Sequence, residues 1–511
     1  MIGQARRKEQ AREPIGTTRS VRRLVAVAMA ALVGGCMVGP DYVRPDVAVP
    51  ATFPEPDATG GRLEPIPIDW WRLYQDEELD RLVMVGLSQG TDVRLAIARV
   101  EEARAQLREA NASLFPEVDM SGIAARSGAS EQTGAVRAGG IGVLNNFQIG
   151  LNTAYELDFW GRLARGREAA RAQLAGSDYG RDVVQLTVAG AIARTYFTVR
   201  ALDAQVAVSR ATLRTAEESV DITRRRSDAG IASELDVYQS EGNRAQLSAQ
   251  IKELTRLRAL AVHQLGVLTG APDLALLAVD VLTLPVPPLP PAGLPSTLLE
   301  RRPDVRQAEA SLEVATALIG VARAQQLPTI SLTAALGVQS DNLSNLLTAS
   351  AGVWSIGVGL AAPILDWGRY AARTEAAEAR AKQAGIRYEQ AVQNAFREVS
   401  DALSNVERAA STEGDLAVRV TQAESALRLA TQRYEAGYSA YLEVLDAQRT
   451  LNDAQLALMR NRLAFLGFTV DLMSALGGGW RETGNEIASQ SRQGLLTGPR
   501  LAPSRRSVPR P

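Results

Sequence analysis

The feature that most constrains the fold is an internal repeat. The segment "RSDAGIASELDVYQSEGN" at 226–243 returns as "RYEAGYSAYLEVLDAQRT" at 433–450, with arginine, Ala-Gly and Leu-x-Val at matching positions. The same 207-residue offset relates "WGR" at 160–162 to "WGR" at 367–369, and motifs further upstream match at an offset of 212 residues. Self-similarity at a long period is the signature of a duplicated architecture. We therefore interpret residues 74–270 and 294–477 as two copies of one structural unit.

Each half has the same order of predicted elements. A helical pattern covers 76–114 and stops before a proline. Apolar residues with a period of two then predict strands, and the second half repeats them; the four strands are expected near 117–127, 147–159, 330–338 and 354–364. Each pair of strands is a β-hairpin. A proline-free helix of about 100 Å and a shorter helix follow; they are expected at 160–228, 368–435 and, for the shorter helix of the first half, 234–268.

The strands raise the question of how the sheet is completed. Four strands of about ten residues with one apolar face are typical of transmembrane β-strands. Four strands cannot close, and an open edge in lipid leaves backbone groups unpaired at a cost of several kcal/mol each. Either the strands form a small sheet in water, or several chains pool theirs, as three chains with twelve strands would. The helices alone also fit an ordinary coiled-coil scaffold.

The composition excludes several functional classes. The net charge is -1 and the hydrophobic content 46%, which argues against a nucleic-acid binder and against a disordered chain. The sequence has one histidine, His263, and one cysteine, Cys36. Nucleophile–base dyads and histidine- or cysteine-based metal sites are therefore nearly excluded. We expect no catalytic residue, no metal site and no cofactor.

The N-terminus has the pattern of a lipoprotein signal peptide over residues 1–35. Two arginines precede a ten-residue apolar run, Leu24 to Val33, which is too short to span a membrane. Two glycines then precede Cys36, which we predict to be lipidated, with palmitate among its acyl chains. Residues 36–73 would be the lipidated N-terminal segment. The alternative is a plain secretory signal with an incidental cysteine.

Motifs across the mature chain resemble one family. They are "CMVGPDYVRPDVAVPATF" at 36–53, "DWWRLYQDEELDRLV" at 69–83, "LLERRPDVRQAEASLEVA" at 298–315, "LPTISLTAALG" at 327–337, "PILDWGR" at 363–369, "YLEVLDAQRTL" at 441–451 and "ALGGGW" at 475–480. The chain resembles the TolC-type outer membrane factors, in the lipidated NodT- and OprM-like branch that serves resistance-nodulation-division efflux pumps. The resemblance implies a mixed α and β fold: a homotrimer with a shared 12-stranded transmembrane β-barrel and a long periplasmic α-helical barrel.

The resemblance also gives the two Ala-Gly turns a role. Ala229-Gly230 and Ala436-Gly437 would be the periplasmic tips of two helical hairpins, where they contact a periplasmic adaptor (membrane fusion) protein. Glycine suits a reversal after a helix, because a positive φ costs a residue with a Cβ atom more. The alternative is a pair of helix C-caps without a partner.

Two acids beside the second turn resemble the family's periplasmic gate. Glu443 and Asp446 are three residues apart and share a helix face, so a threefold axis would bring their copies together. By resemblance, Arg449 and Tyr434 help to tie this entrance shut. The first half differs at the positions that match Glu443, Asp446 and Arg449, where it has Asp236, Gln239 and Gly242. The alternative is a local Asp446–Arg449 pair on a solvated face.

The resemblance implies an outer-membrane exit duct of a tripartite efflux pump, lipid-anchored and extending into the periplasm. It would conduct small molecules such as drugs or toxic compounds passively, with energy from an inner-membrane pump and no catalytic step. The alternatives are a duct for type I protein secretion and a non-conducting periplasmic scaffold lipoprotein. Residues 271–293 are a proline-rich linker, and 478–511 are predicted to be a disordered tail.

Overall fold

The computed structural model describes residues 37–48, 66–128, 143–278 and 301–478, together with the isolated residues 50, 130 and 284. The chain divides into two compact units. The strand unit comprises residues up to Pro45 with Glu101–Gly176 and Glu309–Arg387; the helical unit comprises Asp46–Val100, Ser177–Ala308 and the chain from Tyr388. Each unit takes segments from both halves of the sequence. Cys36, the signal peptide, the tail from 479 and most of the predicted linker lie outside the described residues.

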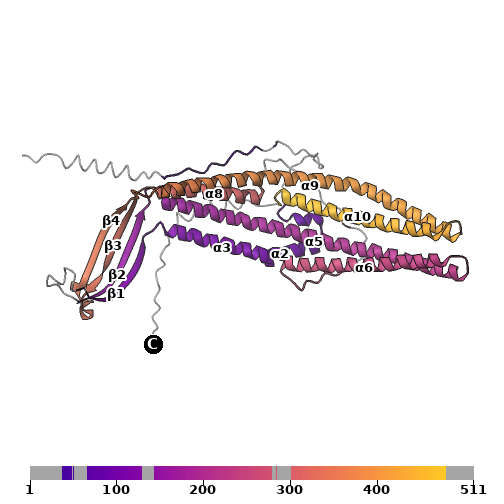
Figure 1. Ribbon diagram of the computed structural model, residues 1–511, viewed down its shortest axis with the longest axis horizontal. Helices are drawn as coiled ribbons and strands as arrows, with labels where there is room; N and C mark the ends of the chain where they lie inside the picture. The colour runs from indigo at the N-terminus through magenta and orange to yellow at the C-terminus, as the bar shows by residue number, and fades with distance from the viewer. Residues whose placement is uncertain are drawn as a thin grey trace, which may run out of the picture. The chain divides into compact units, whose positions relative to one another are not determined.

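The strand unit contains one antiparallel sheet of four strands, in the order β1-β2-β3-β4 (Figure 1). The strands are β1 (Glu117–Gly128), β2 (Val143–Leu157), β3 (Thr329–Ser340) and β4 (Gly352–Ala361). The two predicted hairpins are confirmed as β1–β2 and β3–β4. Pairing of β2 with β3 joins the two halves of the sequence into one sheet. The strands β1 and β4 are its edges.

The register places most of the large apolar side chains of the four strands on one face. One row across the sheet is formed by Met120, Leu151, Leu336 and Trp354. These four side chains are 48–78% exposed, although each is large and apolar. The neighbouring row points to the opposite face and consists of Ser121, Gly150, Gly337 and Val353. The sheet thus has one predominantly apolar face and one face that consists mainly of small and polar residues.

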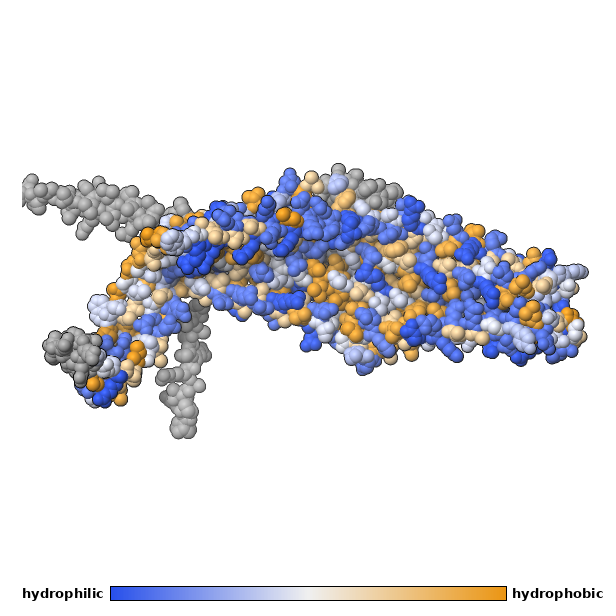
Figure 2. Space-filling view, in the orientation of Figure 1, coloured by the Kyte–Doolittle hydropathy of each residue, from blue (hydrophilic) through white to orange (hydrophobic). Residues whose placement is uncertain are grey.

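Two helices of equal length follow the two hairpins. α5 (Arg162–Asp228) and α9 (Arg369–Glu435) have 67 residues each, and both were predicted to within two residues. Each continues into a shorter antiparallel partner, α6 (Glu234–Thr269) and α10 (Tyr441–Ala475), as Figure 1 shows. Hydrophilic side chains predominate on the helix surfaces in Figure 2, with apolar ones scattered among them. No helix in the described part of the chain is both long and apolar enough to cross a membrane.

Two predicted boundaries were wrong. The helical pattern at 76–114 is two helices, α2 (Glu77–Gln89) and α3 (Thr91–Ala112), separated by Gly90 with ψ 133°. A Cβ atom at Gly90 would be 2.4 Å from the Gly86 carbonyl oxygen and 3.1 Å from the Leu268 carbonyl oxygen at the end of α6. A close backbone approach of this kind needs glycine. The strand predicted at 354–364 ends at Ala361, because Pro363 has no N–H to donate to the sheet.

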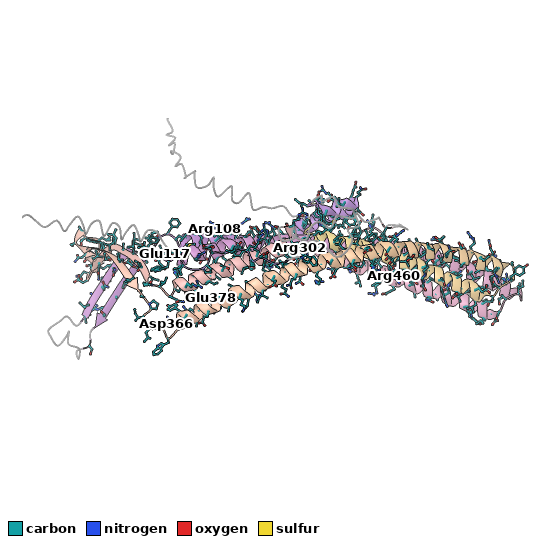
Figure 3. All side chains as sticks on the ribbon, turned by 90° about the horizontal axis from the view of Figure 1, so that it is seen from above. Arg108, Glu117, Arg302, Asp366, Glu378 and Arg460 are labelled. Carbon is teal, nitrogen blue, oxygen red and sulfur yellow. The ribbon has the colours of Figure 1, made fainter. Side chains whose placement is uncertain are left out.

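In the helical unit, an N-terminal segment packs on the hairpin helices. The 3₁₀ helix η1 (Trp70–Tyr74) buries Trp70 and Tyr74 beside α5, α6 and α10. The Tyr74 hydroxyl hydrogen-bonds the Thr469 hydroxyl at 2.8 Å. The buried Arg302, labelled in Figure 3, precedes α8 (Pro303–Ala324) and donates to the Ala475 carbonyl oxygen at 3.0 Å. These contacts hold η1 and Arg302 against α10.

Candidate functional site at the hairpin tips

Both helical hairpins turn by the same backbone motif. Gly230 and Gly437 have φ of 76° and 80°, which is the left-handed conformation. At the first tip, the Ile231 N–H donates to the Arg226 carbonyl oxygen at 2.8 Å. At the second, the Tyr438 N–H donates to the Arg433 carbonyl oxygen at the same distance. The Gly230 and Gly437 N–H groups also donate to the carbonyl oxygens three residues earlier, of Ser227 and Tyr434. The two bonds together form the Schellman motif that ends a helix.

The tips expose large apolar side chains that the sequence analysis did not single out. Ile231 and Tyr438 directly follow the two glycines and are 67% and 80% exposed. Leu235 and Leu442 are 59% and 58% exposed. The two pairs match at the 207-residue offset, and this match is the sequence feature that could have identified them as tip residues. The predicted tip residues Ala229, Gly230, Ala436 and Gly437 are all exposed as well.

The predicted gate acids lie on an exposed face of α10. Glu443 approaches Arg433 at 3.9 Å, with both side chains about half exposed. An ion pair of this exposure contributes at most about 1 kcal/mol. Asp446 and Arg449 are exposed and form no ion pair with each other or with another described residue. The local Asp446–Arg449 pair is therefore not formed.

Unlike these exposed acids, Tyr434 is buried between the hairpins. Its ring is 5.5 Å from the ring of Tyr441, and the Arg226 guanidinium lies 4.7 Å from its centre. Arg226 also donates to the Tyr434 carbonyl oxygen at 3.1 Å, so a residue of the first hairpin caps the C-terminus of α9. The structure thus joins Tyr434 to Arg226 and Tyr441. Sequence matching had paired Arg226 only with Arg433.

Burial changes the acidity of this cluster. It raises the pKa of Tyr434 and raises the pKa of Tyr441 to about 12. Burial also raises the pKa of Asp236, and the nearby positive charge of Arg226 partly offsets this effect. The Tyr434 hydroxyl is buried without a hydrogen-bond partner, and the Tyr441 hydroxyl lies near Ser219, which partly offsets the effect of burial on the Tyr441 pKa. Among the described residues, no group of three or more histidine, cysteine, aspartate or glutamate side chains could hold a metal ion.

The family is decided by a match that occurs twice. The family model described as "Outer membrane efflux protein" matches residues 86–271 and again 294–478. The chain belongs to the outer membrane efflux protein family. The resemblance to outer membrane factors is therefore confirmed.

Individual relatives agree with this assignment. The chain is 34% identical to the probable efflux pump outer membrane protein TtgC of Pseudomonas putida, over 92% of this chain and 98% of TtgC. It is 31% identical to the cation efflux system protein CusC of Escherichia coli, over 89% and 99%. The open-state structure of the MtrE outer membrane channel of Neisseria gonorrhoeae superposes with a TM-score of 0.74 at 30% identity, over 87% and 98%. This efflux protein is an outer-membrane exit duct that extends into the periplasm.

The efflux protein also has a fixed N-terminal strap, residues 37–44. Its first bond joins the Val38 N–H to the Trp160 carbonyl oxygen at 3.1 Å, next to the end of β2. Gly39 has φ 110° and lies against Gly320 of α8, where an added Cβ would be 2.5 Å from the Gly320 Cα atom. The backbones can meet this closely only because both residues are glycine.

Two charged contacts hold the strap. The Arg165 side chain is 2% exposed and pairs with Asp41 at 2.7 Å. Glu309 is buried, accepts a bidentate bond from Arg44 at 2.6 and 2.8 Å, and accepts the Tyr42 hydroxyl at 3.1 Å. Bidentate arginine–carboxylate pairs are among the stronger and more directional polar contacts. The residue that follows Cys36 is therefore held beside the sheet.

Proposed function

We propose that three copies of this chain assemble into one outer-membrane duct that conducts small molecules passively, as the exit of a tripartite efflux pump. The observation that carries the proposal is the sheet, which has one exposed apolar face and two edge strands, β1 and β4. Unpaired edges in lipid cost several kcal/mol for each backbone group. Because β1 and β4 run antiparallel, the β4 edge of one copy can continue into the β1 edge of the next.

The number of copies follows from two arguments. Outer-membrane barrels need at least eight strands, so at least two chains must contribute. The family resemblance favours three chains and twelve strands. We propose that Cys36 carries the acyl groups that anchor each copy in the membrane. Stable anchoring needs more than one acyl group, and the strap holds residue 37, next to Cys36, beside the sheet.

We assign the helical hairpin tips to adaptor contact and the α10 acids to the gate. The exposed apolar pairs, Ile231 with Leu235 and Tyr438 with Leu442, favour burial by a helical partner such as a periplasmic adaptor protein. Around a threefold axis, Glu443 and Asp446 would form carboxylate rings, and such rings favour cations. The inner-membrane pump supplies the energy, and no catalytic step is assigned to this chain.

Single-channel conductance in planar bilayers tests this function. Wild-type protein extracted in detergent should form small, cation-preferring pores. The double substitution Glu443→Gln/Asp446→Asn should increase the conductance or abolish the cation preference, because the rings would lose their charge. Folded protein that forms no pores would favour the scaffold alternative. If the double variant forms pores with wild-type conductance and selectivity, the duct is supported and the assignment of the gate to these acids is wrong.

A further inference from the structure

The helix that carries the gate acids has a buried amide on its opposite side. Gln448 is 3% exposed, whereas Glu443 and Asp446 are exposed. Gln448 is two positions after Asp446, which is a rotation of roughly 200° at 3.6 residues per turn. The contacts of Gln448 therefore fix which way both acids point.

Gln448 links three helices through one buried polar layer. Its Nε2 atom donates to Ser219 Oγ of α5 at 2.9 Å, and its Oε1 atom accepts from Asn243 Nδ2 of α6 at 3.2 Å. Ser219 Oγ in turn donates to the Thr215 carbonyl oxygen at 2.9 Å. Asn243 is 4% exposed and Ser219 is 9% exposed. The directions of these bonds agree, because each contact joins one donor to one acceptor.

The layer continues by one turn toward the tip. There, Thr223 of α5 and Ser240 of α6 are fully buried, and their hydroxyl oxygens are 2.9 Å apart. Apolar residues of similar volume would fill such positions at equal or greater stability. The best-attested use of buried polar contacts between helices is to fix their register. We therefore attribute this layer to register and helix rotation rather than to stability.

The repeat shows that the two hairpins differ in this layer. Under the 207-residue offset, Ser219, Thr223 and Ser240 correspond to three alanines, Ala426, Ala430 and Ala447. Gln448 corresponds to Glu241, which is paired with Arg244 at 3.0 Å near the surface. The second hairpin therefore has no such layer between its own helices and instead contributes Gln448 to the layer of the first hairpin. The hairpin that supplies Gln448 is also the one that has both Asp446 and Arg449.

We propose that Gln448 is a positioning residue of the gate, which, through Asn243 and Ser219, holds α10 in the rotation that presents Glu443 and Asp446 on its exposed face. This inference rests on the gate proposed above. The layer lets α10 occupy one orientation against α5 and α6, whereas an apolar interface would allow several of similar energy.

The test replaces the layer with apolar side chains. Gln448→Leu/Asn243→Leu protein should keep its trimer melting temperature within a few degrees or raise it. In planar bilayers it should show several conductance levels, with a mean conductance at least twofold above wild type and a reduced cation preference. The swapped pair Gln448→Asn/Asn243→Gln restores both amides and should recover most of the wild-type behaviour. Ser219→Ala removes one acceptor and should give a smaller change in the same direction, which keeps the test available if the double variant fails to assemble.

A matched control uses a buried polar pair at the other end of α10. Tyr74→Phe/Thr469→Val removes the hydroxyl contact between η1 and α10 and should leave conductance and selectivity unchanged. The inference is overturned if the apolar double variant conducts like wild type, or if the control changes conductance as much. If Glu443→Gln/Asp446→Asn itself has no effect, the gate is wrong and the inference falls with it. The two failures are thus distinguishable.

Discussion

Single residues at the tips combine geometric and electrostatic constraints. Gly230 and Gly437 are required by their positive φ and not by crowding, since an added Cβ would meet nothing within 4 Å at either position. Their importance could be predicted from the Ala-Gly motif alone. The contact of Tyr434 with Arg226 could not, because Arg226 lies 208 positions earlier in the sequence.

Substitution of either tip glycine should destabilise its hairpin. Gly437→Ala should cost about 1–2 kcal/mol, which is the cost of the left-handed conformation for a residue with a Cβ atom. Gly242→Ala is the matched control: it lies inside α6 with open space around it, and should stabilise by about 0.5–1 kcal/mol. Hydrogen exchange of the amides next to each turn measures both changes. If Gly437→Ala stabilised its hairpin as Gly242→Ala is expected to do, the positive φ of Gly437 would be wrong.

The buried Tyr441 hydroxyl should make the tip sensitive to alkali. Its pKa is about 12 in the folded protein and 10.0 for a free tyrosine, so the folded state holds this proton more tightly. Its contribution to stability is therefore complete below pH 10 and is lost as the pH rises toward 12. Tyr441→Phe should be nearly neutral at pH 7, because the contact of this hydroxyl with Ser219 falls short of a well-formed hydrogen bond. The variant should lose less stability than wild type between pH 9 and pH 11 in thermal melts. Identical pH profiles would rule out the ionisation of Tyr441 as a cause.

At the scale of elements, sequence periodicity predicted most of the structure. The period-two segments are strands, and the proline-free segments are helices of 67 residues. Two features depended on contacts that no local pattern contains. The break at Gly90 arises where the chain meets the end of α6. The pairing of β2 with β3 joins residues about 180 positions apart in the sequence, and a hairpin pattern says nothing of such a pair.

That central pairing should be the most sensitive part of the sheet. Gly337→Ala would place a Cβ atom 2.5 Å from the Ile149 carbonyl oxygen on β2, so the two strands would have to separate. We expect less assembled trimer, measured as the heat-modifiable band on gels of outer-membrane extracts. Gly122→Ala on β1 is the control, because its nearest neighbour would be 3.9 Å away. Loss of assembly in both variants would point to a general intolerance of side chains in this sheet.

At the scale of the whole molecule, assembly should depend on the acyl anchor as well as on the strands. Cys36→Ser should abolish incorporation of labelled palmitate and lower the amount of protein in the outer membrane. Protein that still inserts should conduct like wild type, because the gate and the sheet are unchanged. Labelling that persists in Cys36→Ser would place the modification elsewhere. Unlabelled wild type would favour the plain secretory signal.

The strap also dictates an order of events during maturation. A peptidase that cuts beside Cys36 needs an extended, accessible backbone on both sides of the bond. In the folded chain, the residues just after that bond are already in contact with the rest of the strand unit. The Val38 N–H donates a hydrogen bond to the Trp160 carbonyl oxygen, and Gly39 packs against Gly320. If Cys36 is processed as proposed, cleavage and acylation must precede docking of the strap. A chain whose strap docks onto the strand unit before cleavage would therefore keep its signal peptide.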